Sequence, residues 1–172
     1  MVGSVLFGAT TAFGSSASST PAGGPVQIYA PQSDSIHGTI YVTGAIGDYG
    51  KTLTINSKGK ATSGGNFVKI TLHKGTFEVN STAFNAKSNN LQPTVYAATC
   101  SATGTVSGPV TLFNGTGLYK GISGTVNITA TFGFLGPLFK SGKNKGQCNF
   151  SNNAQPISQY TSITGLGTVS FG

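Results

Sequence analysis

Charge is scarce in this sequence, and two residue types are missing from it. Its 172 residues include ten lysines, three acidic residues, no arginine and no tryptophan. Coiled coils and helical bundles need charged residues and leucine at a helical period, so this composition excludes both classes. Nucleic-acid recognition relies on the planar guanidinium group of arginine. We therefore expect no nucleic-acid partner, although the formal net charge is +7.

Small residues and residues that favour β-structure take the place of the missing charge. Glycine contributes 26 residues, serine and threonine are similarly abundant, and 37% of the chain is hydrophobic. Short apolar segments alternate with glycine-rich turns, a pattern typical of an antiparallel sandwich or barrel. The expected strands are Val26–Ala30, Ile36–Ile46, Lys51–Asn56, Phe67–His73, Thr76–Phe84, Thr94–Thr105, Pro109–Phe113, Thr125–Phe134, Gln147–Phe150 and Ile157–Phe171.

Glycines also recur inside the C-terminal strands, for example at Gly104, Gly108 and Gly133. A glycine within a strand often marks a place where a sheet coils tightly or closes on itself. We therefore predict an all-β fold with a single antiparallel β-barrel of about eight strands. The alternative is a β-sandwich, and the missing tryptophan weakens its immunoglobulin-like form.

The first 24 residues differ from the rest of the chain. They carry no charge, and a short apolar stretch is followed by small residues suited to cleavage near Ala17. Residues 1–24 are either the remnant of a signal peptide or a small-residue tail, and residues 25–172 form the barrel domain. No later segment reaches the ~18 apolar residues of a membrane helix. We predict a secreted, extracellular protein, with association to the cell envelope as a possibility.

The two cysteines, Cys100 and Cys148, fit an exported protein with one disulfide. Two buried free thiols are the alternative. Only two histidines accompany them, His37 and His73, so we expect no metal site. The sequence carries no motif for another cofactor, and we expect none.

The clearest local pattern is the segment Ile70–Val79. It reads as a hairpin with Lys74-Gly75 as its turn, so that Leu72 faces Phe77 on the apolar side. His73 and Glu78 then lie on the other side. They form either a carboxylate–imidazole pair at the mouth of the barrel or a polar outer face in contact with water.

Between Asn114 and Gly124 the sequence contains Gly115-Thr116-Gly117, Tyr119 and Gly121. This string resembles the strand with a GTG, an aromatic, a small residue and a glycine in allene oxide cyclases and dirigent proteins. The resemblance implies an eight-stranded barrel with an apolar central cavity, as in plant and bacterial cyclases and in guides of phenoxy-radical coupling. The richness in small residues and threonine also resembles exported proteins of actinobacteria. No catalytic residue carries over from these families.

The run from Phe132 to Lys140 combines large apolar residues with Gly133, Gly136 and Pro137, so a regular strand must end there. Lys140, Lys143 and Lys145 follow. This run is either an apolar lip beside a cationic rim, suited to an amphiphile, a lipid surface or a partner protein, or a loop folded over the barrel's end. The candidate ligand contacts are Phe132, Phe134, Leu135, Leu138, Tyr119, Glu78 and His73.

Few side chains in this sequence suit acid–base or nucleophilic chemistry, and Asp48-Tyr49-Gly50 reads as a turn. The first functional hypothesis is therefore a non-enzymatic, secreted or envelope-associated barrel that binds a small apolar ligand or an anionic envelope surface. The alternative is a cyclase- or isomerase-like enzyme that works through the shape of an apolar cavity. A third class, binding of ice or crystalline polysaccharide, rests only on the pairs Thr52/Thr54 and Thr129/Thr131.

Overall fold

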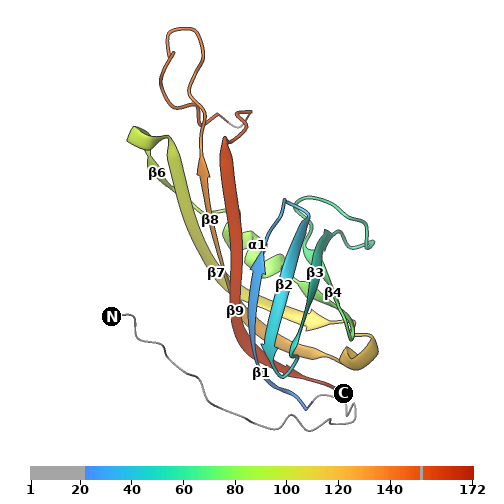
Figure 1. Ribbon diagram of the computed structural model, residues 1–172. Coiled ribbons are helices and arrows are strands. Elements are labelled where there is room, and N and C mark those ends of the chain that lie inside the picture. Colours follow the sequence, from blue (N-terminus) through green and yellow to red (C-terminus); the bar gives the residue numbers. More distant parts are fainter. Residues whose placement is uncertain (1–21, 152) are drawn as a thin grey trace, which may run out of the picture.

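The structure is a computed structural model that describes residues 22–151 and 153–172. These ranges contain nine strands, one α-helix and two 3-10 helices (Figure 1). The strands are β1 (Gly24–Pro31), β2 (His37–Gly44), β3 (Asp48–Ile55), β4 (Phe67–Leu72), β5 (Gly75–Asn80), β6 (Thr94–Tyr96), β7 (Ser101–Phe113), β8 (Ser123–Leu135) and β9 (Ser158–Ser170). The helices are α1 (Thr82–Ser88), η1 (Ala97–Thr99) and η2 (Gly117–Tyr119). The predicted signal segment lies almost wholly outside the described residues.

Eight strands form a closed antiparallel barrel, which confirms the predicted fold. The neighbours around the sheet are β5, β4, β3, β2, β1, β9, β8 and β7. The barrel closes where β5 pairs with β7, with Val79 opposite Leu112. The first and last strands, β1 and β9, pair with each other. The short strand β6 pairs with β7 outside the barrel.

Side chains fill the interior of the barrel. Alternate residues of a strand point to the same face, and in β1 the inward residues Val26, Ile28 and Ala30 are buried between exposed neighbours. The inward residues of the other strands join them in one hydrophobic core. Its largest members, Phe77 and Tyr119, have no solvent-exposed surface. The interior is therefore a packed core across the section where these residues meet.

Two chain connections pack against the core at opposite ends of the barrel. Helix α1 lies behind β1 and β2 in Figure 1 and buries Phe84 in the core beside Gly108 of β7. The sequence pattern predicts a strand from Thr76 to Phe84, but the strand ends at Asn80 and residues 82–88 are helical. These seven residues include a single large apolar side chain, and a short helix buries it by turning Phe84 toward the core. Helix η2 carries Tyr119 into the other end.

The Gly115–Gly124 string is not a strand. It forms the β7–β8 connection, in which Asn114, Gly117 and Gly121 all adopt positive φ angles that an extended strand does not allow. Gly115 lies so close to the carbonyl oxygen of Tyr119 that a Cβ there would overlap it. Glycine is needed at this position because two segments of backbone approach each other closely. The resemblance to a strand does not predict this contact.

The β4–β5 hairpin forms, but its turn lies one residue earlier than the sequence pattern predicts. Leu72 pairs with Gly75 and Ile70 with Phe77, so His73 and Lys74 make the turn. The register moves by two positions, which keeps every side chain on its predicted face. Contacts from distant strands fix this register: the backbone N–H of Lys74 donates to Asp48 Oδ2 at 3.0 Å.

Two other predicted strand boundaries are wrong. Residues 101–113 form one continuous strand, because Gly104 and Gly108 leave room for Phe132 and Phe84 instead of breaking the strand. Pro109 fits within it because the pairing with β5 begins only at Thr111. The segment Gln147–Phe150 is not a strand and makes a single isolated bridge, between Leu138 and Cys148.

Strands β7, β8 and β9 have 13 residues each, whereas β1 to β5 have six to eight. Their surplus length extends past the barrel and, with β6 and the loop at residues 136–157, forms what we call the distal arm (Figure 1). The predicted disulfide between Cys100 and Cys148 is present in this arm and ties the loop to the start of β7. Among the described helices, none has the length and apolar character to cross a membrane.

We expect loss of the disulfide to loosen the distal arm before the barrel. The two cysteines are 48 residues apart, and cross-links of this span stabilise by about 4 kcal/mol in the chain-entropy description. Urea unfolding of the double variant Cys100→Ser/Cys148→Ser should show a loss of up to that size. Hydrogen exchange should accelerate at residues 136–157 while the strands β1 to β5 stay protected; equal acceleration throughout would contradict a local role.

Candidate functional site

Asp48, the first residue of β3, is a buried carboxylate with four polar contacts. Its side chain is 4% exposed. It accepts hydrogen bonds from the Tyr119 hydroxyl at 2.5 Å, the Tyr49 N–H at 2.8 Å and the Lys74 N–H at 3.0 Å. The fourth contact is His73 Nδ1, which lies 3.3 Å from Asp48 Oδ1. The sequence-based interpretation of Asp48 as a simple turn residue is therefore wrong.

The surroundings of Asp48 keep it ionised. Burial on its own raises the pKa of this carboxyl, but the hydrogen bonds from Tyr119, from the Tyr49 and Lys74 backbone and from His73 outweigh it and lower the pKa to about 2. Burial and the Asp48 charge both raise the pKa of Tyr119 above its usual value. At neutral pH this pair is a carboxylate and a neutral phenol that donates to it.

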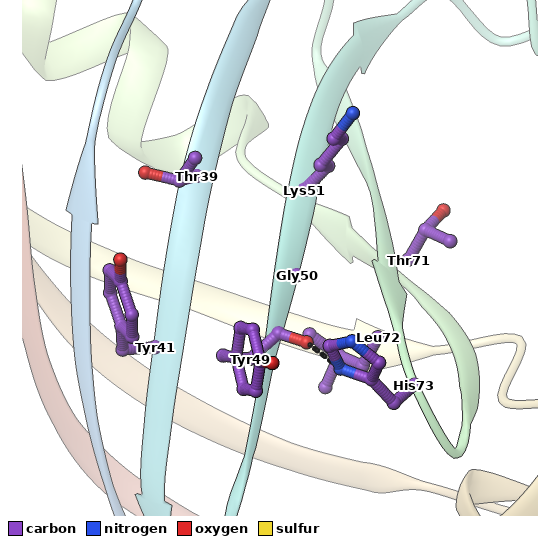
Figure 2. Close-up of a pocket in the computed structure, with 8 residues that line it drawn as sticks. All are labelled: Thr39, Tyr41, Tyr49, Gly50, Lys51, Thr71, Leu72 and His73. Carbon is purple, nitrogen blue, oxygen red and sulfur yellow. Dashed lines mark hydrogen bonds between the residues drawn. The ribbon is translucent and has the colours of Figure 1, made fainter.

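His73 lies in the β4–β5 turn at the edge of this cluster and faces the outside. Its imidazole is 59% exposed and packs on the ring of Tyr49 at a centroid distance of 4.2 Å. Nδ1 also lies 3.0 Å from the carbonyl oxygen of Tyr49, the contact drawn in Figure 2. Since both contacts of the ring involve Nδ1, Nε2 is the nitrogen available to a ligand.

Three tyrosines continue this aromatic surface across the outside of the barrel. Tyr29, Tyr41 and Tyr49 stand directly opposite one another on β1, β2 and β3. Neighbouring rings are nearly parallel, with centroids 6.4 Å and 6.2 Å apart, and each side chain is about half exposed. We call Tyr29, Tyr41, Tyr49 and His73 the aromatic row.

A shallow hollow of about 470 Å³ lies beside the aromatic row. Figure 2 shows Tyr41, Tyr49 and His73 along one side of it and Thr39, Lys51 and Thr71 along the other. The backbone register places these last three opposite one another on β2, β3 and β4. Gly50 lies between the two rows. The hollow thus has an aromatic side and a side that carries hydroxyl groups and one amine.

The structure separates the predicted site residues into three places. His73 belongs to the aromatic row, and Tyr119 supports it from the core. Glu78 stands opposite Lys69 on the outside of the barrel and accepts a hydrogen bond from Asn114 at 3.2 Å. Of the two alternatives for His73 and Glu78, the carboxylate–imidazole pair does not form. The distal arm contains the other four predicted ligand contacts: Phe132, Phe134, Leu135 and Leu138.

Sequence reasoning missed the three tyrosines and the role of Asp48. Tyr29 and Tyr41 alternate with inward apolar residues, so both are identifiable as outward residues of a strand, whereas Tyr49 stands between Asp48 and Gly50 and carries no such signal. Their contact depends on the register of three strands, which the sequence pattern does not provide. No group of three or more histidine, cysteine or acidic residues able to hold a metal ion occurs in the described part of the chain.

Asp48 should make the stability of the fold depend on pH in acid. Its pKa is about 2 in the folded protein and ~3.9 in an unfolded chain, so its stabilising contribution is present above pH ~4 and is lost as the pH falls toward 2. We expect a loss of roughly 2 kcal/mol from this group in urea unfolding.

The variant Asp48→Asn should be less stable at neutral pH and should lack most of this acid dependence. Asp34→Asn is the matched control, because its carboxylate is more than half exposed and bonds only within its own turn. An equal loss of pH dependence in both variants would show that the Asp48 contacts contribute nothing specific.

No protein-family model, curated protein or solved structure matches this chain. The resemblance of the Gly115–Gly124 string to allene oxide cyclases and dirigent proteins therefore stays a prediction.

Proposed function

We propose that this protein is an exported, non-catalytic binding module that holds a saccharide chain on the outside of its barrel. The observation that carries the proposal is the aromatic row, in which three exposed tyrosines from adjacent strands stand side by side next to a hollow. An exposed aromatic cluster of this kind is typical of a binding surface.

The chemistry of the hollow suits a sugar. The C–H face of a pyranose ring packs on the electron-rich face of an aromatic ring, while its hydroxyl groups need hydrogen-bond partners. Tyr41 and Tyr49 supply the rings, and Thr39, Thr71 and Lys51 supply hydrogen-bonding groups across the hollow. The phenolic hydroxyls of the row add further donors and acceptors.

The same row continues around the barrel as a line of hydroxyl groups. Tyr29 stands opposite Thr164 of β9, which faces Thr129 of β8 and then Ser107 of β7. The hydroxyls of Ser107 and Thr129 are 2.7 Å apart. Strands β7, β8 and β9 contain no charged residue. This continuous uncharged track supports an extended polysaccharide in preference to a compact ligand.

The packed interior supports a ligand site on the outside. The apolar central cavity expected from the resemblance requires free space inside the barrel. Core side chains such as Phe77 and Tyr119 occupy that region. An internal ligand remains a sequence-based prediction that the packing of the core does not favour.

Export is supported by the disulfide, because such bonds form and persist in oxidising compartments outside the cytosol.

The alternative of an isomerase- or cyclase-like enzyme has one observation in its favour. A buried carboxylate behind a histidine orients the ring and leaves its second nitrogen able to take a proton from a ligand. Asp48 and His73 have this arrangement at the edge of the hollow. Mass spectrometry of the saccharide after incubation separates the two functions. An unchanged saccharide supports the binding module, whereas a new product that the wild type forms and His73→Gln does not supports the enzyme.

We expect Tyr41→Ala and Tyr49→Ala each to weaken polysaccharide binding about tenfold, because each removes one ring of the row. The measurement is a pull-down titration against cellulose, chitin, xylan and β-1,3-glucan. Tyr96→Ala is the matched control, since Tyr96 is as exposed as Tyr41 but lies on β6. Failure of all four polysaccharides to bind, or equal binding by all three variants, would overturn the proposal.

A further inference from the structure

Exposed large apolar side chains gather at the end of the distal arm. Leu135, Leu138, Phe150 and Ile157 are between 37% and 71% exposed. Contacts bring their positions together at the end of β8: the N–H of Ile157 donates to the carbonyl of Leu135 at 2.8 Å, and Phe150 packs edge-on at 6.3 Å against Phe134, the residue before Leu135. We call these four residues the apolar tip. Soluble surfaces seldom gather large apolar side chains in this way without a binding role.

Three lysines border the apolar tip. Lys140, Lys143 and Lys145 are exposed on a tight loop that is closed by backbone hydrogen bonds between Phe139 and both Gln147 and Gly146. The sequence has no acidic residue after Glu78, so the arm carries no carboxylate that offsets their charge. The end of the arm therefore combines apolar contact with uncompensated positive charge.

The disulfide and the backbone bridges hold this surface in shape although it lies outside the core. Cys148 is bonded to Cys100, and the bridge between Leu138 and Cys148 places the apolar tip against that bond. The N–H of Asn149 donates to the carbonyl of Pro137 at 2.8 Å. A preformed surface loses little conformational entropy when it binds.

We propose that the end of the distal arm docks onto the surface of an anionic lipid bilayer. Lysines attract anionic headgroups through their charge, at about 1 kcal/mol each near such a surface, and apolar side chains next to them enter the headgroup–acyl boundary. A protein partner with acidic groups is less well matched, because the three lysines are spread over a loop and no arginine offers directional pairing.

This docking leaves the aromatic row available to its own ligand. The row lies on β1 to β3, on the outside of the barrel, and the apolar tip lies on the loop that projects beyond β8 and β9 (Figure 1). The two proposals rest on different residues, so either one can fail without the other.

The test is co-sedimentation of the full chain with vesicles of phosphatidylcholine, with and without an equal amount of phosphatidylglycerol. We expect binding only to the anionic vesicles and a decrease as salt rises. The triple variant Lys140→Gln/Lys143→Gln/Lys145→Gln should bind about 100-fold more weakly. The control Lys58→Gln/Lys60→Gln/Lys69→Gln makes the same charge change on exposed lysines of the barrel and should bind nearly as the wild type does.

A second triple variant, Leu135→Ser/Leu138→Ser/Ile157→Ser, tests the apolar contribution. It should retain the fold by circular dichroism and lose vesicle binding, whereas Leu166→Ser, an exposed residue of β9, should not. Equal losses in both lysine variants would show attraction to overall charge only and would overturn the proposal. The proposal would also be overturned if the wild type did not bind anionic vesicles. It would likewise fail if the wild type self-associated in the ultracentrifuge and the serine variant did not.

Discussion

The hydrogen bond between the Tyr119 hydroxyl and Asp48 ties together three separate parts of the barrel. It joins the β7–β8 connection to the first residue of β3, and the same carboxylate accepts the Lys74 N–H from the β4–β5 turn. The aromatic row depends on it, because Tyr49 follows Asp48 and His73 precedes Lys74. A buried charge is costly unless it is hydrogen-bonded, so the carboxylate favours the arrangement in which all three segments meet.

The filled interior explains why the surfaces suited to binding lie elsewhere. Eight strands give a barrel just wide enough for side chains to fill. Here Phe77 and Tyr119 of η2 meet edge to face, with a distance of 5.7 Å between their ring centroids. Exposed apolar and aromatic side chains gather instead on the aromatic row and the distal arm. A barrel of this kind works as a rigid support for two external surfaces.

The fold class could be predicted from the sequence because alternation of apolar and polar residues is local information. Even the inward faces of Ile70 and Phe77 are predicted correctly with the wrong register, since a shift of two positions preserves the face. The site could not be predicted in this way. Tyr29, Tyr41 and Tyr49 come together only through strand pairing, and the turn at His73 is set by Asp48, 25 residues away.

Helix α1 has a consequence for the solubility of the chain. Residues 104–110 of β7, in the described structure, have no strand partner on the side where β6 ends and before β5 begins. An unpaired strand edge of that length is a template on which another chain can add a strand and start an aggregate. Helix α1 packs along β7 there, with Phe84 and Lys87 beside Gly108. The seven-residue helix thus covers this unpaired edge of β7 and keeps it from pairing with another chain.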